Sequence, residues 1–364
     1  MGREPKLECS HFHTLPSSAA IAVVSLVLSI AAFPRNVLAQ RLSSIRQFAL
    51  SAAGGSPQAA ERKPSPAIRQ FITVAKNVQL EVLDWGGTGR PIVFLAGLGF
   101  TAHDFDDFAP QLTSKYHVYG ITRRGFGASS VMTPSIGNYT SDQLGDDVLA
   151  VIDALRLDHP VLMGHSIAGE ELSSVGSRHP EKIAGLVYLD AGYGYAYFDE
   201  AHPDYTVSVN ELRDKLGLLR SGISPQHTLS ILEELTNNDI PRFQTAAKHQ
   251  TDRLKTLPQS SGAEAPITIP EAVINGEGRY GAIHCPILAI YALPHMQGDG
   301  GDPKERVAAD EQDLKITGTQ ADAFAAAMPQ ARIVRIPHAN HSVWKSNGAE
   351  VLREIEGFLA SLPQ

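Results

Sequence analysis

An apolar run that leads directly into a Gly-x-Ser triplet constrains the fold of this chain more than any other feature. Residues 161–163 read as the end of a strand, Gly164 and Ser166 frame the triplet, and a helical pattern begins at Ala168. A serine exposed on a strained strand-to-helix turn needs small residues two positions before and two positions after it. Gly164 and Ala168 meet that need, so the sequence predicts that Ser166 is a nucleophile above the edge of a sheet.

Strand-like and helix-like segments alternate along residues 69–364, which predicts one α/β domain with a mostly parallel central sheet and helices on both faces. Several of the strand patterns are continuously apolar, as expected where both faces of a sheet are covered. The expected strands are 71–83, 91–95, 118–122, 160–163, 183–189, 286–291 and 331–336. The expected helices are 141–155, 168–178, 320–327 and 349–362.

Residues 193–283 interrupt the alternation with a polar, helix-prone stretch between two strands. At about 90 residues it is too long for a structureless loop. In an open α/β sheet, ligands bind at the carboxyl ends of the strands. The sequence therefore predicts a helical cap insertion over that edge, shaping a pocket.

The N-terminus predicts export. Residues 19–33 are apolar except for two serines, and residues 37–39 offer small side chains at the two critical cleavage positions. These features favour a signal peptide over residues 1–39, followed by a flexible linker over 40–68. The expected location is secreted or periplasmic, with no stable membrane insertion after cleavage. The alternative is a chain anchored in the membrane by an uncleaved segment.

The composition limits the partners. Hydrophobic residues make up 43% of the chain, charged residues 19%, and the formal net charge is −8. No basic stripe is present, so nucleic acid is not an expected partner. We expect a small-molecule acyl substrate and neither a cofactor nor a metal ion; the oligomeric state is left open.

An oxyanion hole requires two backbone N–H groups aimed at one point. The N–H of Ile167, directly after the predicted nucleophile, is the first candidate. The second is the N–H of Leu98, in the glycine-rich loop after the strand at 91–95, where glycine lets the backbone approach a substrate closely.

A serine nucleophile needs a general base. Two histidines follow the last expected strand, and His341 is preferred because it lies deeper in the loop, just before an apolar pair and the terminal helix. His338, which follows Pro337, is expected either at the surface or as a residue that supports the base from behind. The spacing of the two histidines alone does not indicate a metal site, because no third ligand accompanies them.

The acid that orients the base is less directly specified. Its usual place, the loop after the strand at 286–291, holds no carboxylate until Asp299 and Asp302. Asp190 ends the preceding strand beside the elbow strand, and a triad is defined by geometry rather than chain order. We take Asp190 as the acid, with Asp302 or Asp299 as alternatives. Glu171, in the first turn after the serine, is attributed to the helix dipole.

Four motifs in order resemble the α/β-hydrolase superfamily, in particular its capped bacterial esterase-like members. They are the oxyanion loop 95–99, the Arg-Gly-x-Gly loop 122–129, the elbow 164–166 and the terminal Asn-His at 340–341. The resemblance covers residues 70–360. It implies the α/β-hydrolase fold, and haloalkane dehalogenases of this superfamily carry their acid where Asp190 stands here.

The predicted reaction is cleavage of a carboxylic ester, or a related acyl bond, through an acyl-enzyme on Ser166. Cofactor-free haloperoxidase activity uses the same triad and is an alternative. A non-catalytic ligand-binding protein on the same scaffold is another, because a fold does not fix a function. Aromatic residues directly after Asp190 are consistent with a site for aromatic or acyl groups and equally with the core of a helical cap: Tyr193, Tyr195, Tyr197 and Phe198.

Overall fold

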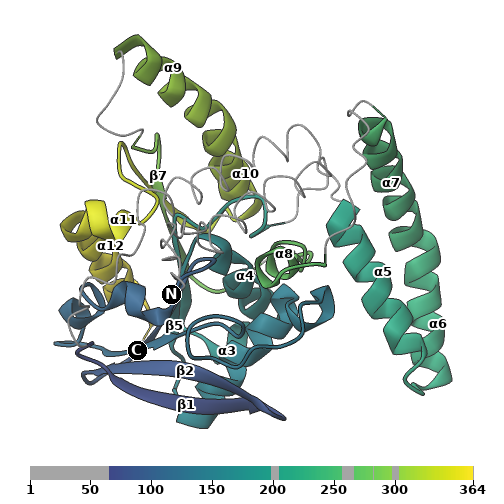
Figure 1. The fold of residues 1–364 in the computed structure, drawn as a ribbon, viewed down its shortest axis with the longest axis horizontal. Helices are drawn as coiled ribbons and strands as arrows, with labels where there is room; N and C mark the ends of the chain where they lie inside the picture. The colour runs from purple at the N-terminus through teal and green to yellow at the C-terminus, as the bar shows by residue number, and fades with distance from the viewer. Residues whose placement is uncertain (1–64, 198–204, 256–265, 282, 297–302, 364) are drawn as a thin grey trace, which may run out of the picture.

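A mixed eight-stranded sheet forms the centre of the computed structural model, which describes residues 65–197, 205–255, 266–281, 283–296 and 303–363 (Figure 1). The predicted signal peptide, and the linker up to residue 64, lie outside these residues. The strand order is β1-β2-β4-β3-β5-β6-β7-β8. The strands are β1 Ile68–Ala75, β2 Val78–Gly86, β3 Pro91–Leu95, β4 His117–Ile121, β5 Val161–His165, β6 Gly185–Leu189, β7 Ile287–Ala292 and β8 Arg332–Ile336.

The first two strands differ from the prediction of a single strand over 71–83. β1 and β2 form an antiparallel hairpin, and β2 also pairs antiparallel with β4. The chain reverses at Asn77, whose φ of 61° is left-handed. Asparagine tolerates that conformation better than most residues, so the tight turn has a local signal that was missed. The pairings from β3 and β4 through to β8 are parallel.

Two apolar layers cover the two faces of the sheet. Within β6, Leu186 and Tyr188 face one layer while Val187 and Leu189 face the other. This alternation explains the continuous apolar run, because both sets of side chains are buried. The first layer packs against α3 Ser141–Leu155, α4 Gly169–Arg178 and α10 Thr319–Ala327, and the second against α11 Val343–Ser346 and α12 Gly348–Ser361.

Helices occupy the insertion between β6 and β7. They are α5 Tyr205–Leu219, α6 Pro225–Glu234, α7 Ile240–Leu254 and α8 Ile269–Ile274. In Figure 1, α5, α6 and α7 lie together at the right. α8 packs its apolar residues against Leu98 and Ile167. The insertion therefore contacts the loop and turn in which the oxyanion donors were predicted. The exact bounds of the cap stay a prediction.

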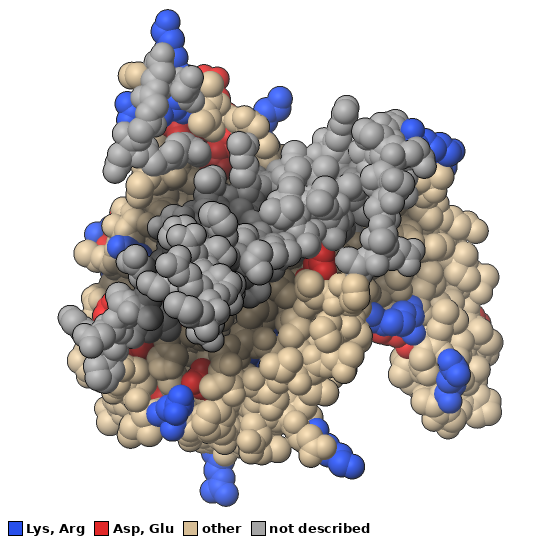
Figure 2. All heavy atoms as spheres, viewed as in Figure 1, with Lys and Arg blue, Asp and Glu red and all other residues tan. Residues whose placement is uncertain are grey.

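Charged side chains are dispersed over the face drawn in Figure 2. Within the described part of that face, Lys and Arg side chains stand at separate points of the outline and do not form one patch. Among the described helices, none is both long and apolar enough to cross a membrane.

Candidate active site

Ser166 lies at the turn between β5 and α4 with a left-handed φ of 54°. A non-glycine residue in that region costs about 1–3 kcal/mol and is retained where the surroundings impose it. The surroundings here are crowded. A Cβ on Gly164 would come within 3.1 Å of the Ala168 carbonyl oxygen, and one on Gly169 within 2.2 Å of the Ala191 carbonyl oxygen. The turn therefore holds the Ser166 hydroxyl at the carboxyl edge of the sheet, as the sequence pattern predicts.

His341 reaches Ser166 from the loop after β8. Its Nε2 lies 2.9 Å from Ser166 Oγ, and its Nδ1 lies 2.6 Å from Asp190 Oδ2. The structure thus brings the three predicted residues into one hydrogen-bonded chain, from serine to imidazole to carboxylate. His338 is not part of it, because its side chain is 63% exposed and its Nδ1 stands 3.9 Å from an oxygen of Asp310.

Asp190 is fully buried and accepts four hydrogen bonds. Oδ2 accepts from His341 and from His295 Nε2, at 2.8 Å. Oδ1 accepts from the Tyr193 hydroxyl at 2.5 Å and from the Ala292 N–H at 3.0 Å. Burial alone would raise the pKa of Asp190, but the charge of His295 and the hydrogen bonds of both histidines lower it below its ordinary value. Asp190 is therefore ionised. The alternatives Asp299 and Asp302 lie outside the described residues.

His295 was not predicted to take part in the site, although it occupies the position after β7 where an acid was expected. Its Nδ1 lies 2.9 Å from Asp313 Oδ2 and its Nε2 faces Asp190. Burial favours the neutral ring, but the charge of Asp190 and the bonds to both carboxylates outweigh burial and raise the pKa of His295 to about 10. The ordinary value is 6.5. The charged ring therefore stabilises the fold fully below pH 6.5, and this contribution is lost as the pH rises through about 10.

Asp190, His295 and His341 also satisfy the distance condition for a metal site, since their ligand atoms all lie within 4.8 Å of one another. The hydrogen-bond geometry does not fit a metal. A bound ion would need lone pairs from both histidine nitrogens at about 2.0–2.1 Å. Instead both nitrogens lie at N–H···O distances from one carboxylate oxygen, and the other oxygen already has two donors. These contacts identify a hydrogen-bonded cluster.

The predicted oxyanion residues both lie near Ser166. Leu98 and Ile167 belong to one buried apolar cluster with α8. Gly97, directly before Leu98, is so close that a Cβ there would lie 3.3 Å from the Cβ of Ser166. The two segments named for the oxyanion hole therefore meet beside the serine.

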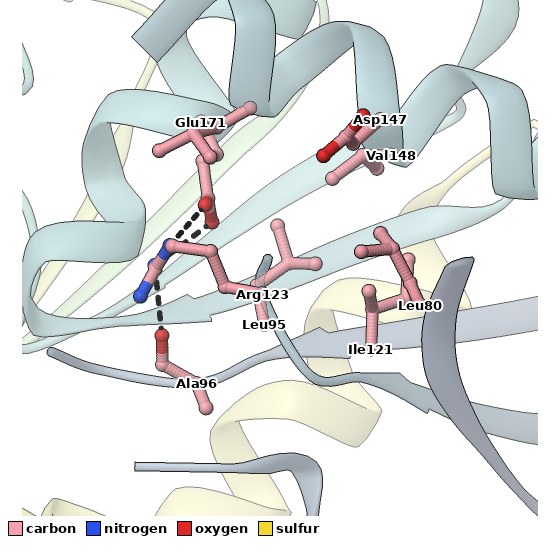
Figure 3. Close-up of a pocket in the computed structure, with 9 residues that line it drawn as sticks. Leu80, Leu95, Ala96, Ile121, Arg123, Asp147, Val148 and Glu171 are labelled. Carbon is pink, nitrogen blue, oxygen red and sulfur yellow. Dashed lines mark hydrogen bonds and ion pairs between the residues drawn. The ribbon is translucent and has the colours of Figure 1, made fainter. Parts of the chain in front are cut away.

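Arg123 links the predicted oxyanion loop to α4 (Figure 3). Its Nη2 donates to the Ala96 carbonyl at 2.9 Å, and its Nε and Nη2 bond both oxygens of Glu171 on α4, at 2.5 and 3.1 Å. Arg123 and Glu171 have 4% and 5% of their side chains exposed. The attribution of Glu171 to the helix dipole was thus incomplete, since its carboxylate links the elbow helix to the oxyanion loop through Arg123.

This ion pair lines a small cavity on the core side of the loop (Figure 3). The cavity lies between the sheet and helices α3 and α4 and is lined by Leu80, Leu95, Ala96, Ile121, Arg123, Leu144, Asp147, Val148 and Glu171. Ser166, Asp190 and His341 do not line it. The cavity therefore lies among the residues that hold the loop in place, and it is separate from the predicted nucleophile.

Replacing Arg123 with methionine is expected to lower the free energy of unfolding by about 3–5 kcal/mol, because Glu171 would remain buried without its counter-charge. The double variant Arg123→Met/Glu171→Leu should recover most of the loss. Urea unfolding of the three chains measures both effects. Lys115→Met, which removes an exposed pair with Glu356, is the control and should change little. A single variant as stable as that control would contradict the expected role of the pair.

The aromatic residues after Asp190 divide between the site and the core. The Tyr193 hydroxyl donates to Asp190, and the ring of Tyr195 packs edge-on against that of Tyr193. Burial, then the charges of Asp190 and Glu170, raise the pKa of Tyr195 well above its ordinary value, so its hydroxyl stays protonated. Tyr197 packs against Phe324. Phe198 lies outside the described residues.

Comparison with known proteins agrees with this architecture. Residues 92–354, well over half of the chain, match the model of the alpha/beta hydrolase family. A non-heme haloperoxidase of Rhodococcus erythropolis is 32% identical over 137 residues, covering 37% of this chain and 48% of that protein. A bifunctional esterase/perhydrolase of Acinetobacter calcoaceticus is 28% identical over 137 residues, covering 37% and 49%. The chain therefore spans about half the length of these two relatives, and about two fifths of others.

A solved structure of a hydrolase from Pseudomonas aeruginosa PA01 superimposes with a TM-score of 0.51 at 19% identity, covering 80% of this chain and 98% of that one. At that identity the likeness concerns the fold alone. Together with the family match, it confirms the fold expected from the four sequence motifs: this chain belongs to the alpha/beta hydrolase family.

Proposed function

We propose that this chain is a serine hydrolase that cleaves a carboxylic ester, or a related acyl bond, through an acyl-enzyme on Ser166. The observation that carries the proposal is the continuous hydrogen-bonded chain from Ser166 Oγ through His341 to Asp190, at 2.9 and 2.6 Å. A serine hydroxyl is a weak nucleophile until an adjacent base takes its proton. A base oriented by a buried carboxylate supplies that condition.

The reaction follows from this geometry. His341 Nε2 removes the hydroxyl proton as Ser166 Oγ attacks the carbonyl carbon, and the N–H groups of Leu98 and Ile167 bind the resulting oxyanion. His341 then donates the proton to the leaving alcohol. Water hydrolyses the acyl-enzyme by the same steps, with His341 as its base. Asp190 stabilises the imidazolium formed in each half-reaction.

Hydrolysis of p-nitrophenyl butyrate by the purified chain tests the proposal. A fluorophosphonate probe should inactivate the enzyme and add its mass to the peptide that contains Ser166. Covalent labelling at another residue, or ester turnover that the probe does not reduce, would contradict it. A chain that binds apolar ligands without turnover would favour the non-catalytic binding protein.

Haloperoxidase-like activity is the second candidate, because the same triad can form an acyl-enzyme and two relatives carry the names haloperoxidase and perhydrolase. It requires hydrogen peroxide in place of water as the second nucleophile. Peroxide-dependent bromination of monochlorodimedone in acetate buffer distinguishes the two candidates. Export through the N-terminal segment also remains part of the proposal, and the mass of the chain recovered outside the cytoplasm would test it.

A further inference from the structure

His295 is the second histidine, besides His341, that bonds the Asp190 carboxylate. Its ring is 2% exposed, and both ring nitrogens face carboxylates: Nε2 that of Asp190 at 2.8 Å and Nδ1 that of Asp313 at 2.9 Å. Its backbone N–H also donates to Asp313, at 2.7 Å. Ionised carboxylates only accept hydrogen bonds, so both ring nitrogens must carry protons. The geometry therefore requires a buried imidazolium between two acids.

Asp313 is itself held in place. It is the last residue of α9 Pro303–Asp313, at the start of a π-helical turn over Leu314–Gly318. The Thr317 hydroxyl donates to Asp313 Oδ1 at 2.7 Å, which leaves Oδ2 for His295. π-helical turns occur mostly as single bulges, frequently at functional sites. The turn here places Thr317 where it can fix the acid.

The loop that carries His295 is joined to the loop that carries His341. The His338 N–H donates to the Pro294 carbonyl at 2.7 Å, and the Met296 N–H donates to the Ala339 carbonyl at 2.8 Å. The rings of His295 and His341 are 6.2 Å apart, centroid to centroid, and both bond the same oxygen of Asp190. A charge on His295 therefore acts on His341 through a fixed geometry.

The other titratable groups around the two rings do not replace this charge. The ring of His165 lies 4.6 Å from that of His341, and burial lowers the pKa of His165, so it is neutral. The nearby phenols also stay neutral because burial raises their pKa values, and Lys345 is 47% exposed to solvent. These phenols are Tyr193, Tyr195 and Tyr291.

We propose that His295 and Asp313 form a positioning pair that sets the pH range in which His341 works as the base. The positive ring of His295 offsets the negative charge of Asp190, so the electrostatic attraction between Asp190 and His341 is weaker than it would be without His295. The Asp313 carboxylate fixes the orientation of the His295 ring and offsets part of its positive charge. This inference rests on the proposed function, since it concerns the same base.

The dependence of kcat/KM on pH, measured between pH 5 and 9 with p-nitrophenyl butyrate, tests the pair. His295→Gln removes the positive charge, and the acidic limb should move up by about one pH unit. Asp313→Asn removes a negative charge beside the positive His295 ring, and the acidic limb should move to lower pH. The double variant restores the net charge of the pair, and its limb should return toward that of the wild type. His338→Gln, which changes an exposed histidine of the adjoining loop, should leave the limb unchanged.

A purely structural pair would lower kcat/KM without moving the limb, and that result in both single variants would overturn the inference. If His295→Gln does not fold, Asp313→Asn still decides by the direction of its shift. If the wild type hydrolyses no ester, the proposed function fails on its own. The coupling is then measured by NMR titration of the His341 ring in the same variants, and equal midpoints would overturn it.

Discussion

Replacing Ser166 with alanine is expected to lower kcat for p-nitrophenyl butyrate by about 10⁴-fold or more, because the variant has no atom that can form the acyl-enzyme. Some rate above that of water can persist through the oxyanion N–H groups. Stability should change little. Alanine also has a Cβ, so the left-handed turn at residue 166 is as strained as before.

The measurement is single-turnover and steady-state kinetics on the variant, with circular dichroism and thermal unfolding to establish the fold. Ser221→Ala is the matched control, because Ser221 lies in the insertion and bonds only the nearby Leu218 carbonyl among the contacts described. The control should keep wild-type kcat. Near-normal turnover by Ser166→Ala would remove the serine from the mechanism.

Replacing Asp190 with asparagine is expected to lower kcat by about 10³–10⁴-fold. All four contacts of Asp190 come from groups that donate: His341, His295, the Tyr193 hydroxyl and the Ala292 N–H. An amide offers acceptor lone pairs on one side only, so at least one of these donors meets an NH₂ group. The charge that stabilises the His341 imidazolium is lost in either orientation.

Asp302→Asn and Asp299→Asn are the controls for this prediction, since both residues were alternatives for the acid. Each should retain wild-type kcat, whereas Asp190→Asn should not. The opposite pattern, with Asp190→Asn active and either control inactive, would assign the acid of the triad to the segment after β7 instead. The pH profile of any residual activity would show which carboxylate still acts.

The parts of the site that sequence could predict are those specified by neighbouring residues. The elbow at Ser166 follows from a strand, small flanking residues and a helix, all within residues 161–178. His341 and Asp190 follow from the rule that catalytic groups stand at the carboxyl ends of parallel strands. His341 lies within hydrogen-bond distance of both Ser166 and Asp190, while the roles of these three residues and of Leu98 and Ile167 stay proposals for the experiments above.

The contacts that were missed join residues far apart in the chain. Arg123 meets Glu171 across 48 positions and His295 meets Asp190 across 105. No periodicity or local motif specifies such a pair, because each partner alone has an ordinary explanation as a surface charge or loop residue. The empty acid position after β7 was the one local sign, and a histidine there can be interpreted only when Asp190 is placed beside it.

Ser166 and Asp190 share one further property, a left-handed backbone at the ends of neighbouring strands β5 and β6, with φ of 54° and 50°. Glycine would adopt both conformations without strain. At position 166, a chain evolving for stability alone would therefore drift toward glycine and become more stable as it became inert, whereas at position 190 the four hydrogen bonds of the carboxylate offset the backbone strain. Retaining a serine at the turn after β5 is what selection for chemistry, acting against selection for stability, would leave in a sequence.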